Sequence, residues 1–161
     1  MKIRKVSNNN HKKAFEIATY RKHYLLPYAK LDVRPSRHNP IQQVYIDSEL
    51  DNEAFTYVLQ SGDEGTVHMD HVLEYNRDPR YMRDQLLYKL TLAAQERVNS
   101  SSLSKRELIR RLGTSPAQFY RLLDQTNYKK SIDQLMALLS ILDCQVELVV
   151  KKKRRRLRAA V

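Results

Sequence analysis

The chain has 161 residues, a hydrophobic fraction of 42% and one cysteine. This length suits one domain or two small ones, the apolar content excludes a disordered chain, and the lone Cys144 excludes a disulfide-stapled domain. The formal net charge is +11, and it is unevenly placed: residues 1–78 hold 11 basic and 11 acidic side chains, whereas residues 79–161 hold 18 and 7. We therefore expect one neutral domain and one domain that binds a polyanion.

The start of the chain and its most apolar window both indicate a cytoplasmic protein. The opening "MKIRKVSNNN" is basic but lacks the apolar run of a signal peptide. Residues 135–150 form the most apolar window, and polar side chains interrupt it before it reaches the length of a membrane span. No amphipathic or lipid-anchoring motif accompanies the basic residues. We expect neither a membrane span nor a membrane anchor.

Residues 1–78 predict a small β-rich domain. Apolar and polar residues alternate in Lys13–Thr19 and again in residues 42–48 and 55–59. The run Ser61–Gly65 is a hairpin signal, after which the alternation resumes, and a short helix follows over residues 70–78. These patterns indicate about five strands, and no internal repeat is evident in the sequence.

Residues 79–161 predict an all-α bundle that ends in a short strand, so that the whole chain belongs to the α+β class. Pro79 suits the first position of a helix that extends to about Val98. Its predicted apolar face is Met82, Leu86, Leu90, Ala93 and Ala94. A last helix begins after Ser131, with an apolar face of Ile132, Leu135, Met136, Leu139 and Leu142. The apolar period then drops to two over Gln145–Val150, which predicts a strand.

Between these helices, residues 103–124 ("LSKRELIRRLGTSPAQFYRLLD") contain the signals for two short helices and a tight turn. Ser104 and Ser115 are each followed three residues later by a glutamate or glutamine, which is the spacing of a capping box. Gly113 suits the left-handed end of the first helix, and Pro116 suits the start of the second. Two apolar faces are predicted to meet, one of Leu108, Ile109 and Leu112 and the other of Phe119, Leu122 and Leu123. This pattern indicates a helix-turn-helix.

An ordinary helical hairpin in a protein core is the alternative to a DNA-binding motif. Two observations favour DNA: the pair occupies the second and third positions in a run of four helices, and the exposed positions around it are basic. The basic positions are Lys105, Arg106, Arg110, Arg111, Arg121, Lys129 and Lys130. In such a motif the second helix enters the major groove.

The same stretch resembles the helix-turn-helix of the lambda repressor-like, Xre/Cro-type family, over roughly residues 81–142. The matching framework consists of Glu107-Leu108, Leu112-Gly113, Ser115, Phe119 and Leu122. The pair Pro116-Ala117 departs from it, because the family more often has polar residues there. The stretches "FEIATYRKHYLLPYAKL" and "FTYVLQSGDEGTVHMD" resemble a small bacterial domain of unknown function, found alone or fused to such motifs, and this resemblance implies no activity.

The resemblance implies a set of DNA contacts. Base contacts are expected at Pro116, Ala117, Gln118 and Arg121. Gln118 can read adenine, Arg121 can read guanine, and Ala117 can contact a thymine methyl. Phosphate contacts fall at the starts of the two helices, Ser104, Lys105 and Ser115. The opening of the fourth helix, Tyr128, Lys129 and Lys130, suits the backbone of the other strand. Solvated surface is the alternative for each basic side chain.

Other features predict neither catalysis nor a cofactor. His68 and His71 lack two further ligands, so no metal site is expected. No phosphate-binding glycine loop and no recognisable nucleophile–base spacing occurs, so we do not expect an enzyme. The segment Lys151–Arg158 has seven charges in eight residues, and we expect a disordered tail that adds non-specific DNA affinity.

The function predicted from the sequence is a sequence-specific DNA-binding transcriptional regulator, with an antitoxin-type autorepressor as one form of it. The 1–78 domain would bind a protein partner or sense a signal. The expected assembly is a homodimer on double-stranded DNA, because Gln145–Val150 is too short to be stable alone and must pair with its copy or with the N-terminal sheet. The alternatives are a protein-interaction adaptor with a helix-turn-helix fold and an RNA-binding protein.

Overall fold

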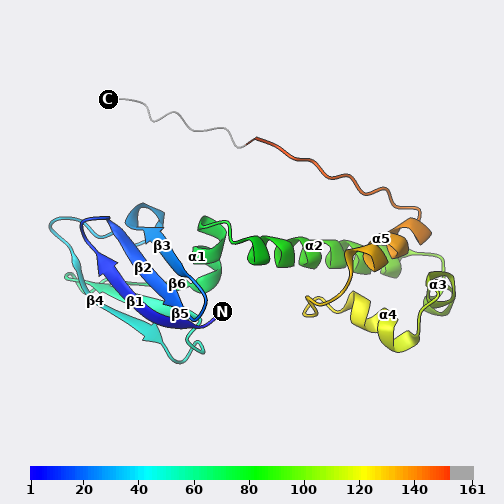
Figure 1. Ribbon diagram of the computed structural model, residues 1–161, viewed down its shortest axis with the longest axis horizontal. Helices are drawn as coiled ribbons and strands as arrows, with labels where there is room; N and C mark the ends of the chain where they lie inside the picture. The colour runs from blue at the N-terminus through cyan, green and yellow to red at the C-terminus, as the bar shows by residue number, and fades with distance from the viewer. Residues whose placement is uncertain (153–161) are drawn as a thin grey trace. The chain divides into compact units, whose positions relative to one another are not determined.

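The computed structural model describes residues 1–152, which form two compact units (Figure 1). The first unit is Met1–Asp84 and the second begins at Gln85, so the division falls inside the long helix α2 (Pro79–Ser100). All strands of the described residues lie in the first unit, and the short helix α1 (Met69–Tyr75) follows them. The α+β class is confirmed, with a helical region following the strands.

The first unit contains two three-stranded antiparallel sheets, each a meander in chain order. The first sheet consists of β1 (Ile3–Asn9), β2 (Ala14–Thr19) and β3 (His23–Pro27), and the 3₁₀ turn η1 (Tyr28–Lys30) follows it. The second consists of β4 (Ile41–Asp47), β5 (Ala54–Leu59) and β6 (Glu64–His68). Each strand is joined to the next by a short connection except β3 and β4, so register within each sheet is set largely by its turns.

The two sheets share two local features that are not evident as a repeat in the sequence. Both middle strands begin with Ala-Phe, at residues 14–15 and 54–55. Both first strands end at a side chain, Asn9 or Asp47, whose oxygen accepts from the backbone N–H groups two and three residues on, at 3.0–3.2 Å. The Phe15 and Phe55 rings meet edge-to-face with centroids 4.9 Å apart and join the sheets in one core.

Two strands of this unit, β1 and β3, were not predicted. In β1, Ile3 alone is fully buried, and Lys, Arg and Asn hide the alternation. In β3, Tyr24 and Leu26 are buried, but the segment is only five residues long and ends in proline. Both are edge strands whose hydrogen bonds come from β2, so pairing rather than local pattern decides that they form.

The start of α2 is fixed by a buried carboxylate. Asp78 Oδ1 accepts from the N–H groups of Arg80 and Tyr81 at 3.1 and 3.3 Å, while Oδ2 accepts from Lys22 Nζ at 2.8 Å and from the Tyr24 hydroxyl at 3.1 Å. The bond from the lysine holds the pKa of Asp78 below its usual value. Burial, together with this carboxylate, raises the pKa of Tyr24 to about 12.

The second unit packs α2, α3 (Lys105–Leu112), α4 (Pro116–Leu123) and α5 (Ile132–Ile141) around one apolar core. The core residues are Leu87, Ala94, Val98, Leu108, Phe119, Leu122, Leu135, Leu138 and Leu139. The predicted α2 has the right length but its apolar face was partly wrong, since Met82 and Leu86 are about half exposed. The buried residues Leu87, Thr91, Ala94 and Val98 define a face rotated by one residue at its start.

The segment after α5 also differs from the prediction. Among the described residues, Cys144–Lys152 has no regular secondary structure, so the strand Gln145–Val150 is not formed. A strand needs a neighbour to satisfy its backbone hydrogen bonds, and no described strand pairs with this segment. The predicted face of α5 was also incomplete, because Leu138 is buried while Ile132 and Met136 are about 40% exposed.

Candidate nucleic-acid interface

Helix α3 begins and ends where its local sequence signals predict. The Ser104 hydroxyl accepts from the Glu107 N–H at 3.2 Å, which satisfies one of the unpaired donors at the helix start. Gly113 closes the helix in the left-handed conformation (φ 66°, ψ 34°), and its N–H bonds back to Arg110. Any other L residue would be strained at this φ, so the glycine allows the chain to turn immediately into α4.

Helix α4 starts after a three-residue turn. The Ser115 hydroxyl accepts from the Gln118 N–H at 3.2 Å, and Pro116 occupies the first turn, where a missing N–H costs nothing. Phe119 and Leu122 face the core of the second unit and are almost completely buried. The predicted helix-turn-helix is therefore formed, with α3 as its first helix and α4 as its second (Figure 1).

The two predicted capping boxes are formed only in part. Each serine caps its helix, but neither Glu107 nor Gln118 is bonded back to the serine N–H. The Glu107 carboxylate instead accepts from Arg110 and Arg111 at 2.6–2.9 Å. These bonds lower the pKa of Glu107 to about 2. The Gln118 side chain is bonded at Oε1 by the Thr114 hydroxyl at 2.8 Å.

Nine of the ten predicted DNA-contacting side chains are exposed. They are Ser104, Lys105, Ser115, Pro116, Ala117, Gln118, Arg121, Tyr128 and Lys129. Ala117 and Gln118 lie three or four residues before Arg121, so the three side chains share one face of α4. Lys105 Nζ lies 5.7 Å from the centre of the Tyr120 ring, a contact that places the start of α3 beside α4.

Lys130 lies in a different environment. Its ammonium donates to Thr91 Oγ1 at 2.7 Å, to the Leu122 carbonyl at 3.0 Å and to the Asp124 carbonyl at 2.5 Å. All three donors of a lysine ammonium therefore have partners inside the protein. Burial lowers the pKa of this ammonium. The structure does not bring Lys130 together with the exposed set, and its tertiary contacts were missed because their partners lie up to 39 residues away.

The charge of the second unit suits a polyanion. Residues 85–152 contain eleven basic and six acidic side chains, so a positive excess remains without residues 153–161, where most of the predicted basic tail falls outside the described part of the chain. Two helix N-termini with exposed serines add partial positive charge and N–H donors.

Among the described residues, no group of three potential metal ligands lies together. None of the described helices is long and apolar enough to cross a bilayer.

Comparison with known proteins places this site in a family. Residues 94–147 match the family described as the Cro/C1-type HTH DNA-binding domain, which is about one third of the chain. No curated protein and no solved structure matches the chain significantly. The match begins within α2 and covers α3, α4 and α5, with their serine-capped starts and the glycine turn between α3 and α4. The C-terminal part of the chain therefore contains a lambda repressor-like helix-turn-helix domain of the Cro/C1 type.

Proposed function

We propose that this protein is a sequence-specific transcriptional regulator whose helix α4 reads DNA in the major groove. The observation that carries the proposal is the exposed face formed by Ala117, Gln118 and Arg121 on a helix that is capped at Ser115 and packed through Phe119. Arginine reads the O6 and N7 atoms of guanine, glutamine reads adenine, and alanine contacts a thymine methyl. Pro116 lies at the start of this face and contributes shape without hydrogen bonds.

The remaining exposed residues would position the domain on the phosphates. Ser104, Lys105 and Ser115 stand at two helix N-termini, where N–H groups and the helix dipole favour a phosphate. Tyr128 and Lys129 precede α5 and would contact the backbone of the other strand. Such contacts fix register and add affinity without reading sequence.

Fluorescence anisotropy with DNA from upstream of the protein's own gene tests this proposal. Excess scrambled competitor DNA is present, and Arg121→Ala is compared with Arg37→Ala, an exposed arginine of the first unit. We expect Arg121→Ala to lower the preference for the upstream DNA by about tenfold, since a bidentate base contact contributes roughly 1–3 kcal/mol of discrimination. Arg37→Ala should leave the preference unchanged. Equal binding of both duplexes by the unsubstituted protein would favour the adaptor alternative, in which the same fold contacts a protein.

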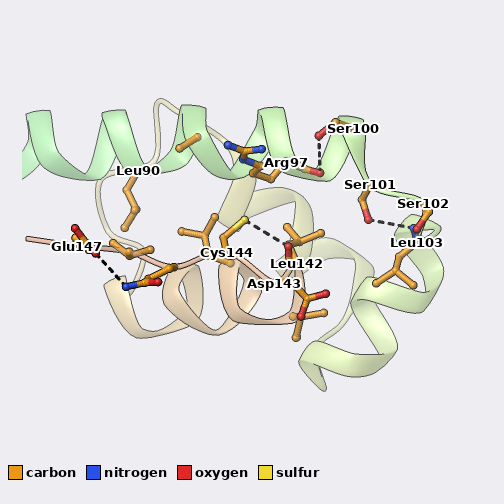
Figure 2. Close-up of a pocket in the computed structure, with 15 residues that line it drawn as sticks. Leu90, Arg97, Ser100, Ser101, Ser102, Leu103, Leu142, Asp143, Cys144 and Glu147 are labelled. Carbon is orange, nitrogen blue, oxygen red and sulfur yellow. Dashed lines mark hydrogen bonds between the residues drawn. The ribbon is translucent and has the colours of Figure 1, made fainter.

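We further propose that the regulator acts as a homodimer formed through the segment after α5. Val146, Leu148 and Val150 alternate along this segment, and the last two are 82% and 88% exposed. The segment borders a groove of about 730 Å³ between α2 and α5. Leu90 projects from α2 toward the segment, and Leu142 and Cys144 line the same groove (Figure 2). A second copy of the segment would cover these apolar side chains and supply the missing strand partner.

The first unit supports a role in binding a protein, with an antitoxin-type autorepressor as the specific form proposed. It has its own core, and its charges nearly balance, with 13 basic and 12 acidic side chains in residues 1–84, so it lacks the strong positive excess of the second unit. Co-expression with the product of the adjacent gene is the test: a toxin that is neutralised and co-purifies through residues 1–84 would support the antitoxin role. An adjacent product with no such effect would leave a regulator of another kind.

A further inference from the structure

The C-terminal end of α4 is held by side chains from outside the helix. The last carbonyls of a helix lack intrahelical partners, and α4 ends at Leu123 without a glycine, with Asp124 already extended (φ −74°, ψ 112°). The carbonyl of Arg121 accepts from Asn127 Nδ2 at 3.2 Å, and that of Leu123 accepts from Gln95 Nε2 at 2.6 Å. The Leu122 and Asp124 carbonyls both accept from the Lys130 ammonium.

Lys130 is the centre of this arrangement because it also bonds to α2. Its third donor meets Thr91 Oγ1, and Thr91, which is completely buried, donates its own hydroxyl proton to the Leu87 carbonyl at 2.7 Å. The Thr91 hydroxyl therefore accepts one hydrogen bond, from Lys130, and donates one, to Leu87. A cation at this position also interacts favourably with the negative end of the α4 dipole. The ammonium thus connects the loop before α5, the end of α4 and the middle of α2.

We propose that Lys130 is a positioning residue for DNA reading, which acts by fixing α4 against α2 and not by contacting phosphate. This inference rests on the proposed function. With its three donors used by protein acceptors, the ammonium has no N–H left for DNA, whereas the adjacent Lys129 is exposed. Loss of Lys130 releases the end of α4, and the last turn of the helix, which contains Arg121, is then held less firmly against α2.

The test compares Lys130→Met with Lys129→Met in the full chain, using two measurements. The first is the salt dependence and sequence preference of binding to the upstream duplex and to a scrambled duplex. The second is amide hydrogen exchange of residues 118–124 without DNA. A phosphate-contacting lysine contributes about 0.9 to the slope of log affinity against log salt. A positioning lysine leaves this slope unchanged and affects preference instead.

For Lys130→Met we expect an unchanged salt slope, a preference lowered by about tenfold, and faster exchange at the end of α4. For Lys129→Met we expect a smaller slope with unchanged preference and exchange. A reduced slope in Lys130→Met with unchanged exchange and preference would overturn the proposal. If Lys130→Met does not fold, Thr91→Val is the second variant, because it keeps the volume but removes the hydroxyl acceptor. It must show both a lower sequence preference and faster exchange at the end of α4. Unchanged preference and exchange in Thr91→Val would overturn the proposal.

The two proposals fail in different ways. If the unsubstituted protein shows no sequence preference, the proposed function is wrong, and the positioning role of Lys130 is then wrong as well. If that preference is present but Lys130→Met retains both it and slow exchange of α4, the inference on Lys130 alone is wrong.

Discussion

At the scale of single residues, Glu107 decides how much positive charge the helix-turn-helix presents. Its carboxylate binds Arg110 and Arg111, so two of the arginines on α3 are partly neutralised. The bonds from these arginines are also the reason that the pKa of Glu107 falls to about 2. The carboxylate is therefore ionised at neutral pH and carries the charge that pairs with both arginines.

Glu107→Gln is expected to change DNA affinity and acid stability together. Releasing both arginines should strengthen non-specific binding and steepen its salt dependence, as measured with scrambled duplex. Because the folded pKa lies below that of the unfolded chain, Glu107 stabilises the fold above about pH 4.5, and this contribution is lost as the pH falls toward 2. The variant should lose less stability over this range. Glu96→Gln, at an exposed position on α2, is the control, and equal acid profiles for all three proteins would contradict the expectation.

At the scale of elements, the helix-turn-helix and the sheets depend on different information. The starts of α3 and α4 lie within three residues of the side chains that cap them, so local sequence predicted them. The sheets depend on pairs of distant residues, such as Tyr57 of β5 opposite Gly65 of β6. The Tyr57 ring crosses the glycine, and its hydroxyl donates to the Val33 carbonyl at 2.6 Å. A Cβ at Gly65 would overlap this ring and hydroxyl, so a side chain is excluded for a reason that only the pairing shows.

Gly65→Ala should therefore destabilise the second sheet. Overpacking of this kind costs about 1–3 kcal/mol, and a shift of the Tyr57 ring away from the new Cβ would disturb its bond to Val33. Faster amide hydrogen exchange in β5 and β6 would be the direct evidence. Glu64→Ala changes an exposed residue on the same strand and should have little effect. Unchanged exchange in Gly65→Ala would mean that the sheet adapts without strain.

At the scale of the whole molecule, charge and fold divide the chain in the same way. The first unit nearly balances its charges and contains the described strands, whereas the second carries almost all of the positive excess and the DNA-binding motif. The apolar segment after α5 belongs to the second unit and ends in the basic residues Lys151 and Lys152. A dimer formed there would place two recognition helices on one duplex, which raises affinity and specificity together.

Removal of residues 145–161 should yield a monomer with much weaker DNA binding. The apolar strip of Val146, Leu148 and Val150 is lost, and with it the partner proposed for the groove beside α2. Sedimentation measures the assembly, and anisotropy measures the affinity. A second variant that ends at Val150 retains the strip but lacks the basic tail, so it should stay dimeric and lose only non-specific affinity. A dimer that survives the longer deletion would exclude this interface.

The sequence by itself determined the helix-turn-helix, because each of its signals is local. Ser104, Gly113, Ser115 and Pro116 act on backbone groups within a few residues, and no distant partner is needed to interpret them. The tertiary structure alone decided the edge strands β1 and β3, the buried face of α2, and the contacts of Lys130. In each case the deciding partner is distant in sequence: β2 for the strands, the packed helices for α2, and Thr91 for the lysine. Local periodicity does not predict such contacts, because the free energy that stabilises them is gained only when the distant segments meet.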